Sequence, residues 1–198
     1  MTKSPILSAK VGDNSDLFLD IFSIYGKEYG TIIDITYGKG VFWKKINTEL
    51  YDFFPSDILT GVDYNNLPYK ASSVDMVVFD PPYMGNNGGK SYAVARNYNV
   101  DVPKYSKDYI PKLYFNSMDE ANRVLKKGGI LIVKCQDEIQ SGKQNMNHIT
   151  IIQYAIENGF RVEDLFILVQ KNTPIMRHQY QLHARKNHSY FIVLTKIK

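Results

Sequence analysis

The sequence predicts an α/β fold with a mostly parallel sheet. Short apolar runs rich in β-branched residues alternate with segments of helical periodicity along the 198 residues. This is the pattern of sheets whose parallel strands are joined by crossover helices. Glycines directly follow the first of these strands, as at a tight strand–helix turn. The last two apolar runs, 165–169 and 190–194, are joined by 171–187 and form a candidate antiparallel pair.

The first third of the chain contains one clear helix and two strands. Residues 1–14 are polar and predict a partly ordered lead-in. The apolar residues Leu17, Phe18, Ile21, Phe22 and Tyr25 then recur at helical spacing and end before Gly26. We expect, in order, a helix from Ser15, a strand at 31–35, a helix at 42–46, a strand at 51–54 and a strand end or ordered loop at 60–63.

The rest of the chain continues the alternation after a strand at 74–79. Residues 84–107 are rich in Gly, Asn and Tyr without clear periodicity, which predicts a long loop. We then expect a helix over 107–127 capped by Gly128 and Gly129, a strand at 130–133, a helix over 148–158 closed by Gly159, and the two final strands.

Length and composition predict one cytoplasmic domain. The chain is long enough for one core and short for two. Its 44% hydrophobic and 22% charged residues are ordinary for a soluble globular protein. No apolar run reaches membrane-spanning length, and the first twelve residues lack the apolar core of a signal peptide. The single Cys135 excludes a disulfide framework and predicts a buried structural thiol.

Basic residues gather late in the chain. The net charge is +4 and the pI about 8.9, but no Asp or Glu follows Asp164. The basic residues beyond it are Lys171, Arg177, Arg185, Lys186, Lys196 and Lys198. Such a segment suits a polyanionic partner such as nucleic acid, although a solvated basic face explains it equally well.

The stretch 77–83 has the strongest chemical signal. An apolar strand end leads into Asp80, Pro81, Pro82 and Tyr83. The prolines stiffen the turn and cannot donate backbone hydrogen bonds. The Asp80 carboxylate and the Pro81 carbonyl can each accept an N–H, while Tyr83 can stack on a ring. This set suits an amino group on a flat ring.

A second group of residues predicts a cofactor site. Gly38 and Gly40 allow backbone to approach a bound group at a strand's carboxyl end, and Asp34 just before them can bind a cationic amine. Asp57, at the expected end of the next strand, can accept both hydroxyls of a ribose, and Asp63 competes for that role. With Thr36, these residues are our candidate cofactor ligands.

Together these segments resemble the S-adenosylmethionine-dependent amino methyltransferases of nucleic acids. The glycine loop, the acidic strand end and Asp80-Pro81-Pro82-Tyr83 follow the order of that family, which includes the DNA adenine-N6 and cytosine-N4 enzymes. The stretches 67–75 and 128–134 resemble the segments on either side of its catalytic strand. The resemblance implies a class I, Rossmann-like methyltransferase domain over 1–198, with a seven-stranded, mostly parallel sheet and a C-terminal antiparallel strand.

The resemblance also implies a reaction. Asp80 and Pro81 would bind the exocyclic amine of a target base beside the cofactor's methyl group, and Tyr83 would stack on the base. Adenine N6 in DNA is the first choice. Cytosine N4, an RNA amine, or a non-catalytic S-adenosylmethionine-binding partner subunit remain alternatives. No metal is required.

Target binding is predicted to involve basic and aromatic side chains. The chain lacks room for a separate target-recognition domain, so a homodimer or partner subunit is expected to supply strong specificity. The loop 84–107 is a candidate nucleic-acid clamp, because basic residues contact phosphates and aromatics stack on bases. The substrate-binding candidates are Lys90, Tyr92, Arg96, Arg177, Arg185 and Lys186.

Overall fold

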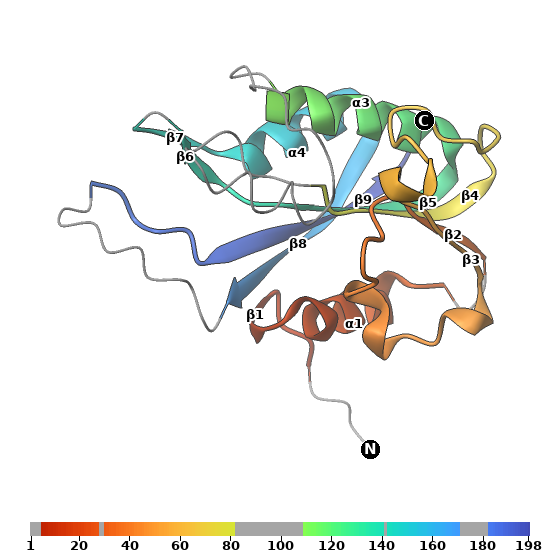
Figure 1. The fold of residues 1–198 in the computed structure, drawn as a ribbon, viewed down its shortest axis with the longest axis horizontal. Helices are drawn as coiled ribbons and strands as arrows, with labels where there is room; N and C mark the ends of the chain where they lie inside the picture. The colour runs from red at the N-terminus through yellow and green to blue at the C-terminus, as the bar shows by residue number, and fades with distance from the viewer. Residues whose placement is uncertain (1–4, 28–29, 82–108, 141, 171–181) are drawn as a thin grey trace.

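A computed structural model describes residues 5–27, 30–81, 109–140, 142–170 and 182–198. Its described residues form a seven-stranded sheet (Figure 1). In spatial order the strands are β1 (Ala9–Gly12), β8 (Phe160–Gln170), β9 (His188–Lys196), β5 (Leu125–Cys135), β4 (Val74–Phe79), β2 (Thr31–Asp34) and β3 (Asp52–Pro55). Only β9 runs antiparallel to its neighbours, β5 and β8. The predicted fold class is confirmed.

Helices cover both faces of the sheet. The other elements are α1 (Asn14–Tyr25), α3 (Tyr109–Val124), α4 (Asn147–Glu157), the hairpin β6 (Glu138–Gln140) and β7 (Lys143–Asn145), and the 3-10 helices η1 (Phe42–Lys45), η2 (Thr48–Leu50) and η3 (Ile58–Thr60). In Figure 1, α3 and α4 lie on one face and α1 on the other. No helix in the described part of the chain is long and apolar enough to cross a membrane.

The central strands are buried on both faces, which explains their continuous apolar runs. Val77 of β4 packs in the core under α3 and α4, whereas the next residue, Val78, packs in the core under α1. Both side chains are fully buried. Such a strand has little freedom to shift its register, so the residue that follows it has a defined position.

The segment after β2 is shorter and tighter than predicted. The helix expected at 42–46 is present as one turn of 3-10 helix, Phe42–Lys45. Its Trp43 packs edge-on against Phe18 of α1, with ring centroids 5.0 Å apart. Asn47 then caps the separate 3-10 turn η2 by accepting a hydrogen bond from the Glu49 N–H. The apolar residues of this segment therefore pack against α1 from short 3-10 turns and do not form one longer helix.

One further expectation is wrong, and one element was not predicted. Residues 9–12 are not a partly ordered lead-in, because they pair in parallel with 167–170 of β8. This edge strand has only four residues and no buried one, so it left no strand pattern in the sequence. The hairpin β6–β7 was likewise not predicted, and its short polar strands pair only with each other in the described structure.

The end of α3 also differs from the prediction. The helix stops at Val124, and Leu125 already pairs with Val74 of β4, so Gly128 and Gly129 lie within the irregular first part of β5 rather than at a helix cap. Lys196 of β9 supplies the cap. Its Nζ donates to the carbonyl oxygens of Asn122 at 2.6 Å and of Leu125 at 2.8 Å.

Replacing Lys196 with Met should therefore destabilise the protein. The change leaves two carbonyl groups beside a buried side chain without their donor, which costs about 1–3 kcal/mol in the free energy of unfolding. Urea denaturation measures this loss, and Lys127→Met, a change at an exposed lysine of β5, is the control. Equal stability of the two variants would show that Lys196 does not cap α3.

Candidate functional site

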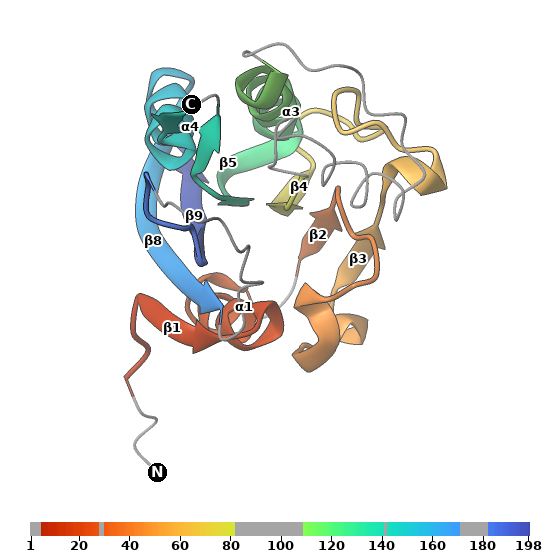
Figure 2. The ribbon, with the colours of Figure 1, turned by 60° about the vertical axis from the view of Figure 1, so that its left-hand side comes forward.

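The carboxyl ends of four strands meet at one edge of the sheet. Strands β3, β2, β4 and β5 are adjacent and parallel (Figure 2). Asp34 ends β2, Asp57 lies two residues after β3, Asp80 directly follows β4, and Lys134 is the penultimate residue of β5. Three acids and a lysine from distant parts of the sequence thus lie along the same edge.

Asp34 is a buried carboxylate without a cationic side chain bonded to it in the described structure. Its side chain accepts hydrogen bonds from Trp43 Nε1 at 2.6 Å and from the Thr36 N–H at 2.9 Å, and the residue is 3% exposed. Burial raises the pKa of Asp34 to about 7, against the effect of these two hydrogen bonds, and the negative charge of Asp80 adds to the rise. A cation placed here would favour the ionised form.

Thr36 connects the turn after β2 to the turn after β4 by a hydrogen bond. Its Oγ1 accepts a hydrogen bond from the backbone N–H of Asp80 at 2.6 Å. Next to it, the Ile35 N–H donates to the Val78 carbonyl at 3.0 Å. The Thr36 hydroxyl therefore fixes the position of the turn that begins at Asp80. Its expected contact with a cofactor stays a prediction.

The glycine loop and Asp57 form one unit. Gly38 and Gly40 have φ values of 52° and 63°, in the left-handed region that favours glycine. Asp57 Oδ2 accepts a hydrogen bond from the Gly38 N–H at 3.0 Å, and its Oδ1 accepts one from the Leu59 N–H at 3.0 Å. These bonds orient the Asp57 carboxylate beside the loop.

Asp63 lies apart from this unit. Its side chain is exposed, and its Oδ1 accepts hydrogen bonds from the backbone and side-chain nitrogens of Asn65. Within the described residues, Asp57 rather than Asp63 is bonded to the glycine loop. The geometry therefore favours Asp57 in the choice that the sequence left open.

Asp80 has two unlike carboxylate oxygens. Oδ2 lies 3.2 Å from Nζ of Lys134. Oδ1 is buried and has no hydrogen-bond partner among the described residues. Burial raises the pKa of Asp80 above its ordinary value, and the positive charge of Lys134 acts in the opposite direction. Pro81, which follows, is buried as well.

Lys134 is the functional candidate that sequence analysis did not identify individually. In the sequence, it was only the last residue of the stretch 128–134, which resembles a segment beside the catalytic strand. A lysine at the end of an otherwise apolar buried strand was the available signal, because such a charge needs a partner. Next to it, Cys135 is fully buried as predicted, and burial raises the pKa of its thiol.

The remaining predicted residues divide into two groups. Arg185 is exposed and Lys186 half-buried, in the segment that enters β9. Because Tyr190 of β9 pairs with Cys135 of β5, this segment approaches the same edge of the sheet. Pro82, Tyr83, Lys90, Tyr92, Arg96 and Arg177 lie outside the described residues.

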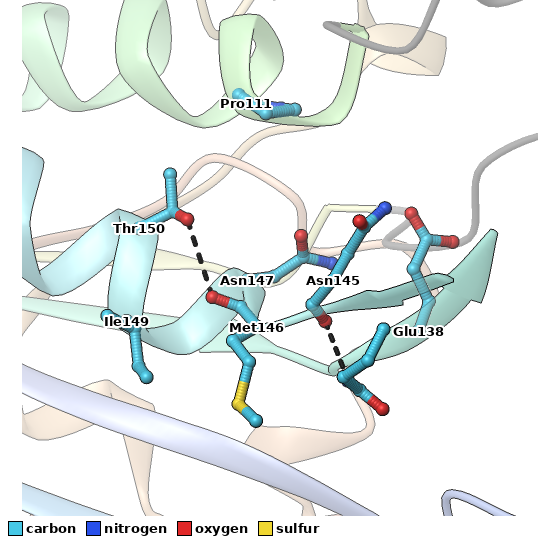
Figure 3. Close-up of a pocket in the computed structure, with 8 residues that line it drawn as sticks. Pro111, Glu138, Asn145, Met146, Asn147, Ile149 and Thr150 are labelled. Carbon is cyan, nitrogen blue, oxygen red and sulfur yellow. Dashed lines mark hydrogen bonds between the residues drawn. The ribbon is translucent and has the colours of Figure 1, made fainter. Parts of the chain in front are cut away.

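A polar cavity lies further along this edge. It has a volume of about 350 Å³ and is enclosed by Pro111 of α3, the hairpin β6–β7 and the start of α4 (Figure 3). Its polar lining residues are Glu138, Gln144, Asn145, Asn147 and Thr150. Beside it, the buried Asp137 bonds His148 Nδ1 at 2.7 Å, and the His148 ring stacks on Tyr190. Sequence analysis identified neither the cavity nor this pair.

Residues 74–198 match the sequence profile of a DNA methylase family named for N6 and N4 methyltransferases. The match begins at β4 and includes Asp80 and Lys134, the paired groups at the centre of the site. The chain belongs to this DNA methylase family. No match was found among curated proteins.

Solved structures relate the fold of this DNA methylase-family chain to other proteins. An rRNA methylase from Streptococcus thermophilus has a TM-score of 0.52 at 12% identity, covering 96% of this chain and 99% of that one. A SAM-dependent methyltransferase from Methanosarcina mazei has a TM-score of 0.50 at 14% identity, covering 89% and 97%. This likeness shows a shared class I methyltransferase fold, as the sequence predicted.

A third structure comes from a longer protein. It is a Thermus thermophilus protein described as a DNA modification methylase, with 18% identity and a TM-score of 0.46. The match covers 69% of this chain and 51% of that one. The DNA methylase-family chain thus spans about half the length of this relative.

A side chain at Gly40 should disturb the glycine loop. A Cβ there would lie 2.5 Å from the Tyr37 hydroxyl, whereas a Cβ at Gly61, which also has positive φ, would meet no atom within 4 Å. Left-handed backbone costs a non-glycine residue about 1–2 kcal/mol. Chemical denaturation should therefore show a larger loss for Gly40→Ala than for the matched Gly61→Ala. Equal losses would mean that Tyr37 moves aside freely.

Proposed function

We propose that this protein transfers a methyl group from S-adenosylmethionine to the exocyclic amino group of a nucleic-acid base, with adenine N6 in DNA as the first choice. The observation that carries this proposal is the buried Oδ1 of Asp80, which lies at the sheet edge and has no hydrogen-bond partner among the described residues. A buried acceptor without a donor is costly, and a ligand N–H would satisfy it.

The residues at the ends of β2 and β3 fit S-adenosylmethionine. Gly38 and Gly40 let the backbone approach the ligand closely. Asp57, held beside them, can accept hydrogen bonds from ribose hydroxyls with its remaining lone pairs. The buried Asp34 can face the ligand's ammonium group, and Asp63 would lie further out, near the adenine ring. When bound, the cofactor supplies an electrophilic methyl group.

Asp80 and Pro81 act on the other reactant. An aromatic amine is a weak nucleophile because its lone pair is delocalised into the ring. Asp80 Oδ1 and the Pro81 carbonyl oxygen would each accept one N–H, which favours a tetrahedral nitrogen and directs its lone pair away from the ring. The Asp80 carboxylate also stabilises the positive charge that develops on nitrogen. The hydrogen bonds from these N–H groups would hold the amine during transfer. The methylated nitrogen would then release one proton to the Asp80 carboxylate or to water, and the cofactor would be left as S-adenosylhomocysteine.

The choice of polymer and base rests on the family and on charge. The matched family is described as DNA methylase, and the resemblance carried by Asp80-Pro81-Pro82-Tyr83 implies adenine N6 as the first choice. Arg185 and Lys186 add positive charge near the site's edge, as a polyanion requires. RNA is the second candidate because a solved structure with this fold is named an rRNA methylase. A homodimer or partner subunit would add sequence specificity.

Methyl transfer from radiolabelled S-adenosylmethionine to unmethylated DNA and to RNA, followed by nucleoside analysis, tests this function. Asp80→Ala should lower the rate by about 10²–10³-fold or more, because the amine loses its charged acceptor. Cofactor affinity, measured by calorimetry, should change little. Asp52→Ala, at an exposed acid of β3, is the control and should retain activity.

The identity of the labelled nucleoside distinguishes between the possible targets and between an enzyme and a binding subunit. N6-methyladenine from DNA that is absent with Asp80→Ala supports the proposal in full. N4-methylcytosine or a methylated RNA base would keep the reaction class and change the target. Cofactor binding without labelled product on either polymer would contradict catalysis by this chain and indicate a binding subunit.

Cofactor affinity should also depend on pH. The pKa of Asp34 is about 7 without ligand, and an ammonium group beside it lowers that pKa, so binding requires the carboxylate to release its proton. The dissociation constant should rise by roughly tenfold per pH unit as the pH falls below 7. Calorimetry between pH 5.5 and 7.5 measures this slope. The Asp34→Asn variant should bind the cofactor more weakly and show a smaller dependence of the dissociation constant on pH. An unchanged pH dependence in this variant would exclude Asp34 as the titrating group.

A further inference from the structure

The ion pair between Lys134 and Asp80 is unusual among the lysine–acid pairs of the described structure. The Lys134 side chain is only 4% exposed, and that of Asp80 is 25% exposed. On the same two strands, β4 and β5, the pair of Asp75 and Lys126 lies 2.8 Å apart, but its lysine is 45% exposed. A surface pair of that kind contributes little, whereas a buried pair needs accurate geometry to offset desolvation.

The surroundings of Lys134 restrict its ammonium group. Its Nζ lies 5.4 Å from the ring centroid of Phe42 and 5.7 Å from that of Phe191, within the range of cation–π attraction. The Lys134 carbonyl oxygen accepts a hydrogen bond from the buried Tyr114 hydroxyl at 3.0 Å. The ammonium group of Lys134 therefore lies among residues of β5, β9 and η1 and is not on an exposed, mobile side chain.

We propose that Lys134 is the positioning residue of the amine site: its ammonium group holds Oδ2 of Asp80, so that the carboxylate stays ionised and directs only Oδ1 to the substrate amine. This inference rests on the proposed function. It assigns different tasks to the two oxygens of one carboxylate, as their contacts do.

The charges around Asp80 explain why it needs a cation. Burial favours the neutral acid, and the carboxylate of Asp34 on β2 repels a second negative charge. Burial raises the pKa of the neighbouring Cys135 thiol and keeps it neutral, so it adds no further negative charge. Lys134 on β5 is the positive group that counteracts both effects. A protonated Asp80 would lose acceptor capacity and would not stabilise positive charge on the amine.

The pH dependence of turnover distinguishes this role from a structural one. At saturating S-adenosylmethionine, Lys134→Met should shift the acidic limb of the kcat profile upward by about 1–3 pH units, the usual effect of a nearby opposite charge on an Asp. The loss of activity should therefore be large at pH 6 and much smaller at pH 9. Lys134→Arg should restore the wild-type profile in part, because it keeps the charge. A loss that is equal at all pH values would overturn the proposal.

A matched variant controls for the removal of any lysine from β5. Lys126→Met removes the ion pair with Asp75 at the opposite ends of the same strands. Its acidic limb should coincide with that of the wild type. A similar shift in this variant would show that the effect arises from overall charge, which contradicts a specific role for Lys134.

A measurement that needs no activity keeps this proposal separate from the proposed function. In protein with ¹³C-labelled aspartate, the Asp80 carboxyl resonance is assigned from Asp80→Asn, and its pKa is measured by NMR titration. We expect a carboxylate at pH 7 in the wild type and a higher pKa in Lys134→Met or, if that variant is unfolded, in Lys134→Gln. An Asp80 that is still protonated at pH 8 in the wild type would overturn the proposal, as would a pKa that is unchanged by the loss of Lys134. An inactive wild type with the expected titration would contradict only the proposed function.

Discussion

The parallel register of β2, β4 and β5 is the constraint on which the site depends. Asp34 pairs with Val78, and Phe79 pairs with Val133, so β2 ends one residue before β4 and β5 ends two residues after it. Because Val77 and Val78 are buried on opposite faces, a shift by one residue would exchange the two cores. The hydrophobic cores thereby position Asp80 and Lys134, although neither of these side chains belongs to them. The hydrogen bond from the Asp80 N–H to Thr36 completes the arrangement by joining the turns after β2 and β4.

The electrostatics of the site follow from this geometry. Two carboxylates and one ammonium group lie at the ends of three adjacent strands, where burial acts against every charge. Lys134 is directed to Asp80, while the hydrogen-bond donors of Asp34 are the neutral groups of Trp43 and Thr36. The two acids therefore differ in their preferred partners. Asp34 gains most from a cationic ligand, and Asp80 from a neutral N–H donor, which matches the two reactants of an amino methyltransferase.

The sequence predicted those parts of the fold that depend on local patterns. The buried strands at 31–35, 74–79 and 130–133 were evident because both of their faces are apolar, and the helix from Ser15 was evident from its apolar stripe. The cap of α3 was not predictable, because it depends on Lys196, which is distant in sequence. Strand β1 was missed for the same reason: this four-residue, little-buried edge strand is defined by its partner β8 and not by its own residues.

The candidate site shows the same division. Asp34, Gly38, Gly40 and Asp80 could be proposed from the sequence because each lies at a strand end or in the turn that follows it. The choice between Asp57 and Asp63 required the bond to Gly38, which joins two turns. The role of Lys134 required the register of β4 against β5, since 54 residues separate it from Asp80. The local sequence thus indicates the candidate groups, and the tertiary contacts show which of these groups are bonded to one another.

The position of β9 has a consequence for how the molecule assembles. This strand comes after all the others in sequence, yet it lies between β5 and β8 and provides the strand pairing that joins β1 and β8 to the rest of the sheet. During synthesis, the two parts of the sheet can form beforehand, but each would expose an edge with unpaired backbone groups. The sheet becomes continuous only when residues 188–196 insert between them. Completion of the fold is therefore a late, non-local step. A chain that stops before β9 would leave two strand edges unpaired, which chaperones, proteases and other copies of the chain could bind.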